Sequence, residues 1–237
     1  MGFRFQFPFS TCERKKENKK PVQPYSFYAN CVAVFVIFVY LVKASLTLKH
    51  SSLIILYLSF LLFEAWHAFS HYYHFEEVKE DGREKEKESI QGIPIQAYVA
   101  HVLFYFVILA TFYAMRSLGG LTQANKGNLL FLLFLLDMFM IFILDWKGIY
   151  MMFSGFTLLL LVYYMHFHLI PKKLKKYMYI MIGLLVLLTS FVVNEALFCE
   201  KMQKKYPFPY HVIVEILGII LFWILSHFYW MWGKERT

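Results

Sequence analysis

Long apolar runs separated by short charged stretches are the feature that most constrains how this chain folds. The chain has 237 residues, and 30 of its 40 Asp, Glu, Lys and Arg residues fall in five short stretches. These stretches are residues 1–29, 76–88, 172–176, 200–205 and 234–236. The runs between them reach the roughly 20 residues that a helix needs to cross a bilayer. The pattern therefore predicts an all-α, polytopic membrane protein.

Composition agrees with a membrane chain and excludes several other classes. Hydrophobic residues make up 59% of the sequence and charged residues 17%, against about 25% charged in soluble domains. This balance excludes a disordered chain and a coiled coil, and three cysteines without a motif exclude a disulfide scaffold. A net charge of +8 can indicate a nucleic-acid partner. Here the charges lie in loops and tails, so we expect the bilayer as the partner and no nucleic acid.

We predict a seven-transmembrane helix bundle over residues 30–232, with a basic N-terminal tail (1–29) and a C-terminal tail (233–237). The predicted spans are about 30–48, 52–74, 95–116, 128–145, 148–168, 177–198 and 210–232. Seven spans place the termini on opposite faces. The face that carries the N-terminus then holds 14 Lys and Arg residues and the other face 10. The positive-inside rule therefore predicts a cytoplasmic N-terminus, and the sequence leaves the identity of the membrane and the oligomeric state open.

Four acidic residues lie inside the predicted spans, with no Lys or Arg at the same depth. They are Glu64, Asp137, Glu195 and Glu215. An ionised carboxylate in the middle of a bilayer costs about 3 kcal/mol on insertion scales. We therefore expect protons, histidines or a bound metal ion as their partners, and Asp137 can equally be a protonated structural residue.

Histidines accompany the acids of the second and seventh spans. At 100° per residue, one face of the second span carries an acid and three histidines within about 80°. These residues are Glu64, His67, His71 and His74. In the seventh span, His211 and Glu215 lie one turn apart. For His74, which follows Tyr72 and Tyr73, a place in an interfacial aromatic belt is the alternative.

Span direction brings these residues to one face of the predicted bundle. The second and sixth spans end on the N-terminal face, and the third and seventh begin there. The residues within roughly 15 Å of that face are Glu64, His67, His71, His101, Glu195, His211 and Glu215. Imidazoles and carboxylates together are typical of a first-row metal site, most often zinc, with iron or manganese as alternatives.

The segment 194–218 (NEALFCEKMQKKYPFPYHVIVEILG) resembles the end of the alkaline ceramidases. Those enzymes are seven-span zinc amidases of the CREST superfamily. Their sixth span ends with an acidic or amide residue and a Cys, and a basic loop and a span that opens with His-x3-His follow. The resemblance implies that His211 matches the first of these zinc ligands, with Glu215 at the position of the second. Glutamate can replace histidine as a zinc ligand, as in His2Glu sites.

The second span is similar to the family motif Ser-x3-His only in part. His67 looks like the zinc-binding His, with Phe63 at the serine position, whereas Ser70 and His74 have the spacing in another register. No Asp at the start of the third span matches the family's acidic catalytic residue. The acidic calcium-binding segment at the N-terminus of the family also has no counterpart.

We therefore expect a zinc-dependent membrane hydrolase that acts on a lipid amide or ester and is reached from the bilayer. The expected metal ligands are His67, His71, His211 and Glu215. The expected catalytic residues are Glu64 and Glu195, as general base or as partners of a histidine N–H. Two alternatives stay open: a proton-coupled transporter or relay, and a non-catalytic relative that acts as a receptor or scaffold.

Overall fold

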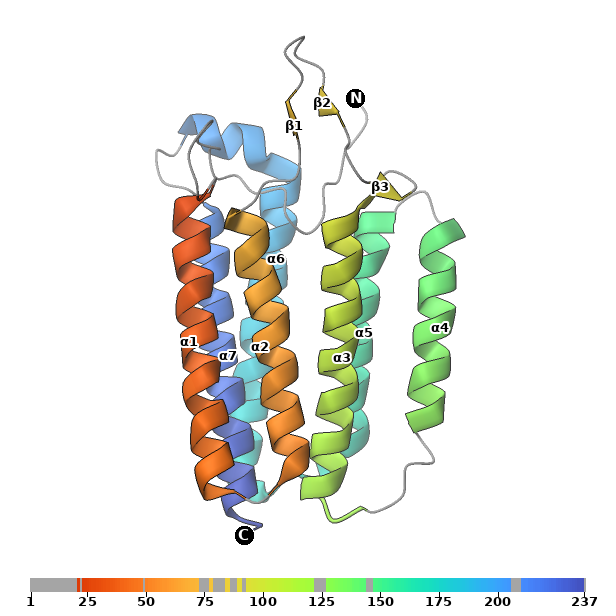
Figure 1. Ribbon diagram of the computed structural model, residues 1–237, viewed down its shortest axis with the longest axis vertical. Coiled ribbons are helices and arrows are strands. Elements are labelled where there is room, and N and C mark those ends of the chain that lie inside the picture. Colours follow the sequence, from red (N-terminus) through yellow and green to blue (C-terminus); the bar gives the residue numbers. More distant parts are fainter. Residues whose placement is uncertain are drawn as a thin grey trace.

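The described part of the protein is a bundle of seven α-helices that run side by side (Figure 1). The computed structural model describes residues 21, 23–48, 50–72, 77–78, 84–85, 89–90, 93–121, 127–143, 147–205 and 210–236. In this part of the chain the helices are α1 (Pro24–Thr47), α2 (Ser51–Tyr72), α3 (Ile95–Leu118), α4 (Gly127–Ile143), α5 (Lys147–His166), α6 (Lys175–Lys205) and α7 (His211–Lys234). The predicted all-α class is confirmed for the bundle.

The connections add only short elements. Two 3-10 helices, η1 (Phe167–Leu169) and η2 (Lys172–Leu174), lie on either side of Pro171 and join α5 to α6. Between α2 and α3, β1 (Glu77–Val78) pairs antiparallel with β2 (Glu84–Lys85), and β3 (Ser89–Ile90) pairs antiparallel with β4 (Ile93–Pro94).

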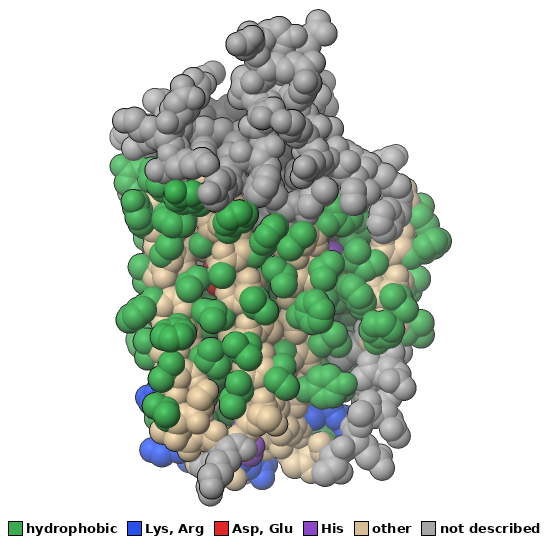
Figure 2. Space-filling view, in the orientation of Figure 1, with side chains coloured by type: hydrophobic (Ala, Val, Ile, Leu, Met, Phe, Trp, Pro, Cys, Tyr) green, Lys and Arg blue, Asp and Glu red, His purple; other side chains and the backbone are tan. Residues whose placement is uncertain are grey.

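Five helical segments of the described chain are long and apolar enough to cross a membrane. They are Pro24–Thr47, Ser51–Tyr72, Tyr98–Leu118, Lys172–Glu195 and His211–Lys234. Hydrophobic side chains cover the visible side of the molecule, and Lys and Arg side chains gather at its lower end (Figure 2). Length, composition and surface together support a membrane protein with several transmembrane helices.

Two helices differ from the predicted bounds by more than two residues. Helix α1 begins at Pro24 rather than near residue 30, because proline at a first helical position has its φ angle already fixed and loses no needed hydrogen bond there. Helix α6 continues to Lys205 rather than ending near residue 198. Glu, Lys, Met and Gln are good helix formers, so the helix extends past the end of its apolar run.

Helices α2 and α7 contact each other within the bundle. Helix α1 packs against both α2 and α7, and α7 also packs against α6. Helix α2 packs against α3, which in turn contacts α5, while α4 lies at the edge of the bundle against α3 and α5 (Figure 1). At the lower end, a Cβ atom on Gly233 would come within 2.6 Å of Leu53 and 2.8 Å of Leu48. Glycine there lets α7 approach the α1–α2 turn closely.

Candidate metal centre

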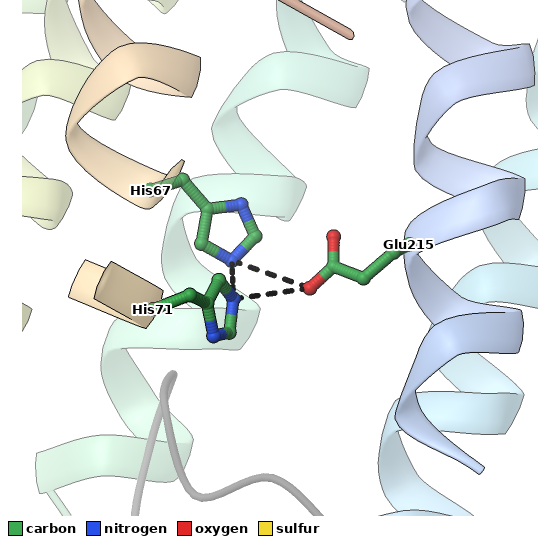
Figure 3. A group of neighbouring side chains, drawn as sticks. All are labelled: His67, His71 and Glu215. Atoms are coloured by element: carbon green, nitrogen blue, oxygen red, sulfur yellow. Dashed lines mark hydrogen bonds and ion pairs between the residues drawn. The ribbon is translucent and has the colours of Figure 1, made fainter. Parts of the chain in front are cut away.

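The end of α2 and the beginning of α7 bring three ligand-bearing side chains together. His67 and His71 are one helical turn apart, so both imidazoles leave the same face of α2. Glu215 lies in the first turns of α7 and extends toward them (Figure 3). Helices α2 and α7 run antiparallel, so the end of α2, with His67 and His71, lies beside the beginning of α7, with Glu215.

The three side chains have the spacing of a tetrahedral metal site. His67 Nε2 and His71 Nε2 are 3.2 Å apart. They lie 3.7 Å and 3.2 Å, respectively, from Glu215 Oε1. Ligand atoms about 2.1 Å from a zinc ion at the tetrahedral angle are about 3.4 Å from one another. These three residues form a possible metal-binding group within the described chain, with ligand atoms all within 4.8 Å.

The outer nitrogens of the two α2 histidines face acceptors. His71 Nδ1 lies 2.7 Å from Gln23 Oε1, at hydrogen-bond distance. Because the amide oxygen only accepts, His71 donates its Nδ1–H and keeps the Nε2 lone pair on the side of Glu215. His67 Nδ1 faces Glu64 Oε2 at 3.8 Å. Metal-bound histidines almost always have a hydrogen-bond partner of this kind, which fixes the tautomer and the ring orientation, and His71 has one in Gln23.

His211 connects Glu215 to a further carboxylate. Its Nδ1 donates to Glu195 Oε2 at 2.7 Å, and its Nε2 lies 2.6 Å from Glu215 Oε1. Both atoms are buried, and at this separation they form an ion pair or a hydrogen bond. Three ring nitrogens therefore lie within 3.7 Å of one carboxylate oxygen, a concentration of ligand atoms that suits a bound cation. The donor set therefore fits a first-row metal ion.

Burial sets the direction from which the centre can be reached. The side chain of His71 is fully buried, whereas 22% of the His67 side chain is exposed. Beside His67, the rings of Phe63 and Phe104 are in contact, with 5.5 Å between centroids. The exposed part of His67, which lies beside the apolar ring of Phe63 with 6.4 Å between centroids, suits a substrate with hydrocarbon chains.

The structure brings all six predicted site residues into one cluster. They are Glu64, His67, His71, Glu195, His211 and Glu215. Within it, His67, His71 and Glu215 form the metal-binding group, while His211 and Glu195 lie beside Glu215. His74, also predicted on this face, lies outside the described residues.

Two residues have places that the sequence did not predict. His101 does not join the metal-binding group, because its Nε2 bonds to Asp137 Oδ2 on α4 at 3.0 Å. Gln23 is part of the site, although it lies in the segment predicted to be a tail. No motif marks Gln23, because a contact between the residue before α1 and the end of α2 depends only on how the helices pack.

Comparisons with known proteins give no family for the chain. No protein-family model matches it, and no curated protein matches it significantly.

Proposed function

We propose that this chain is a metal-dependent integral membrane hydrolase that acts on a lipid amide or ester, with zinc as its metal. The observation that carries the proposal is the orientation of the two α2 histidines. Their Nε2 atoms face Glu215 at 3.7 Å and 3.2 Å, while their Nδ1 atoms face Glu64 and Gln23. Two imidazoles and one glutamate are the ligand set of several catalytic zinc sites, which keep one position open for water.

The residues around the metal position have separable roles in this proposal. His67, His71 and Glu215 would hold the ion, and His211 would orient Glu215 with the support of Glu195. When bound, zinc activates a water molecule and polarises the scissile carbonyl. Glu64 would accept the proton of the attacking water and pass it to the leaving nitrogen or oxygen, because its carboxylate lies beside His67 and is not in a short hydrogen bond to it.

A lipid substrate follows from the position of the centre. All the ligands lie in membrane-length helices, and the partly exposed His67 lies beside the ring of Phe63, which packs against Phe104. A substrate would enter from the bilayer with its carbonyl near His67 and its hydrocarbon chains along these rings. In the proposed topology α4 and α5 also span the membrane, which gives the seven spans of the alkaline ceramidases that the segment 194–218 resembles.

A layer of aromatic rings favours a hydrolase over a transporter. One turn from Glu64 on α2, Phe60 is fully buried and contacts Phe222 of α7, with 5.6 Å between ring centroids. Beyond these two rings, Tyr57 donates to the Ser226 carbonyl at 2.7 Å. A transport path between α2 and α7 would need polar groups where the two rings pack, whereas a one-sided active site does not.

Metal content and lipid cleavage test the proposal together. We expect purified wild-type protein to contain about one first-row metal ion per chain and to release fatty acid from a suitable lipid amide or ester. The variant His71→Ala should lose both properties. The matched control is His227→Gln, which removes a histidine of α7 that bonds Tyr40 at 3.1 Å at the other end of the bundle. Wild-type protein without stoichiometric metal would contradict the proposal.

A further inference from the structure

Gln23 lies at the N-cap position of α1, yet its side chain does not cap that helix. It makes no side-chain capping bond, and Pro24 opens the helix behind it. The residue is 3% exposed, and its amide oxygen lies 2.7 Å from His71 Nδ1. The buried amide of Gln23 leaves its own helix terminus uncapped and bonds instead to a histidine of another helix. The fold of the site therefore determines its position.

The backbone of Gln23 is held at the same point. Its N–H donates to the carbonyl of His71 at 3.2 Å, and its carbonyl accepts from Phe27 N–H at 3.0 Å to begin α1. The first of these bonds satisfies one of the carbonyls that the end of α2 leaves without a helical partner. The rings of Phe27 and Tyr72 pack beside them, with 5.3 Å between centroids. The position of the amide is therefore determined by both α1 and α2.

We propose that Gln23 is a positioning residue of the metal centre, which fixes the tautomer and the orientation of the His71 imidazole. This inference depends on the proposed metal function. A neutral imidazole carries its proton on either nitrogen, and only the Nδ1–H form leaves Nε2 free to bind a metal. The Gln23 oxygen selects that form. Without it, part of the protein would carry the proton on Nε2, where it blocks the metal position.

A neutral acceptor at position 23 also suits the charge of the cluster. Glu64, Glu195 and Glu215 already place three carboxyl groups around the centre. A fourth would raise the cost of burying the site in a bilayer. The amide gives the hydrogen-bond acceptor without the charge, so Gln23→Glu should keep the His71 tautomer, whereas Gln23→Leu should lose it.

Metal affinity measured by competition with a chelator tests the inference. We expect Gln23→Leu to bind zinc about 10–100-fold more weakly than wild type, as for other residues that orient a metal-bound histidine. Gln23→Glu should bind at least as tightly as wild type, because it keeps the acceptor. The matched control is Asn30→Leu, which removes another buried amide of α1 whose bond goes to the Ser26 carbonyl at 3.0 Å. Equal affinity in wild type and Gln23→Leu would overturn the inference.

The ¹⁵N chemical shifts of His71 in metal-free protein give a second readout that does not depend on the metal. Wild type and Gln23→Glu should show a protonated Nδ1 and an unprotonated Nε2, and Gln23→Leu should show a mixture. If wild type binds no metal, the proposed function fails and these shifts alone decide the role of Gln23. A mixed tautomer in wild type would then overturn it as well.

Discussion

Two buried imidazole–carboxylate clusters in the described part of the bundle differ in what their nitrogens face. At the α2–α7 centre, nitrogens of three histidines lie within 3.7 Å of a single carboxylate oxygen, Glu215 Oε1. Between α3 and α4, Asp137 Oδ2 accepts from His101 Nε2 at 3.0 Å and from the Tyr105 hydroxyl. Three imidazoles therefore converge on Glu215, whereas one imidazole and one hydroxyl bind Asp137.

The difference separates a group of side chains that could hold a metal ion from a group that joins two helices. Asp137 with His101 and Tyr105 is a network of donors and acceptors that holds α4 against α3. At the α2–α7 centre, the outer nitrogens of His71 and His211 bond to Gln23 and Glu195, so their Nε2 atoms face Glu215. The mere presence of a buried His and a carboxylate therefore does not identify a metal site. Several ring nitrogens that converge on one carboxylate oxygen are the stronger indication.

Removal of a ligand at the α2–α7 centre should have the largest effect. We expect Glu215→Ala to lower metal affinity by more than about 100-fold, beyond the range of residues that only orient a ligand, and to abolish lipid cleavage. Asp137→Asn, the matched change in the other cluster, should keep full metal content by mass spectrometry. Loss of metal from both variants would remove the distinction between the clusters.

Glu64→Gln should separate chemistry from metal binding. With the proton acceptor removed, we expect the rate of lipid cleavage to fall by about 100–10,000-fold, while metal content stays at the wild-type level. The measurement is the initial rate of fatty-acid release beside metal analysis of the same preparation. An unchanged rate would assign the proton transfer to another group.

Glu195→Gln tests whether His211 acts by positioning Glu215. In the wild type, His211 Nδ1 bonds to Glu195 Oε2 at 2.7 Å. The amide of the variant can still accept this bond through its oxygen, but it can also turn its NH2 group toward the same nitrogen. We expect a metal affinity about 10-fold lower with full occupancy at saturating metal. Complete loss of binding would instead make His211 a ligand that cannot be replaced.

His101→Phe should have the smallest effect and only on stability. Removal of a hydrogen bond between membrane helices costs about 0.6 kcal/mol on average, so we expect a slightly lower free energy of unfolding in detergent. Metal content and cleavage rate should not change. A loss of metal in this variant would show that the α3–α4 cluster supports the α2–α7 centre after all.

Much of the bundle follows from the apolar runs alone. Runs of about 20 apolar residues have few alternatives to a membrane helix, and the predicted second, third and seventh spans lie within two residues of α2, α3 and α7. Apolarity does not determine where a helix ends, however. Helix α6 continues to Lys205 through charged residues that are themselves good helix formers.

The candidate site could be predicted to the extent that helix periodicity and direction determine it. Periodicity placed Glu64, His67 and His71 on one face of α2, and antiparallel packing placed that face opposite Glu215. The periodicity of one helix does not predict which of its residues contact residues of a neighbouring helix. His101 faces Asp137, and Gln23 reaches His71, through the rotation and approach of neighbouring helices, which depend on the packing of the whole bundle.

X-ray absorption at the metal edge of purified wild-type protein tests the central claim most directly. The structure predicts a single metal with only nitrogen and oxygen ligands at about 2.0–2.2 Å. The outer-shell scattering should be that of imidazole rings, and it should weaken in His71→Ala. A protein that holds no metal, or one whose metal spectrum is unchanged by His71→Ala, would contradict the account.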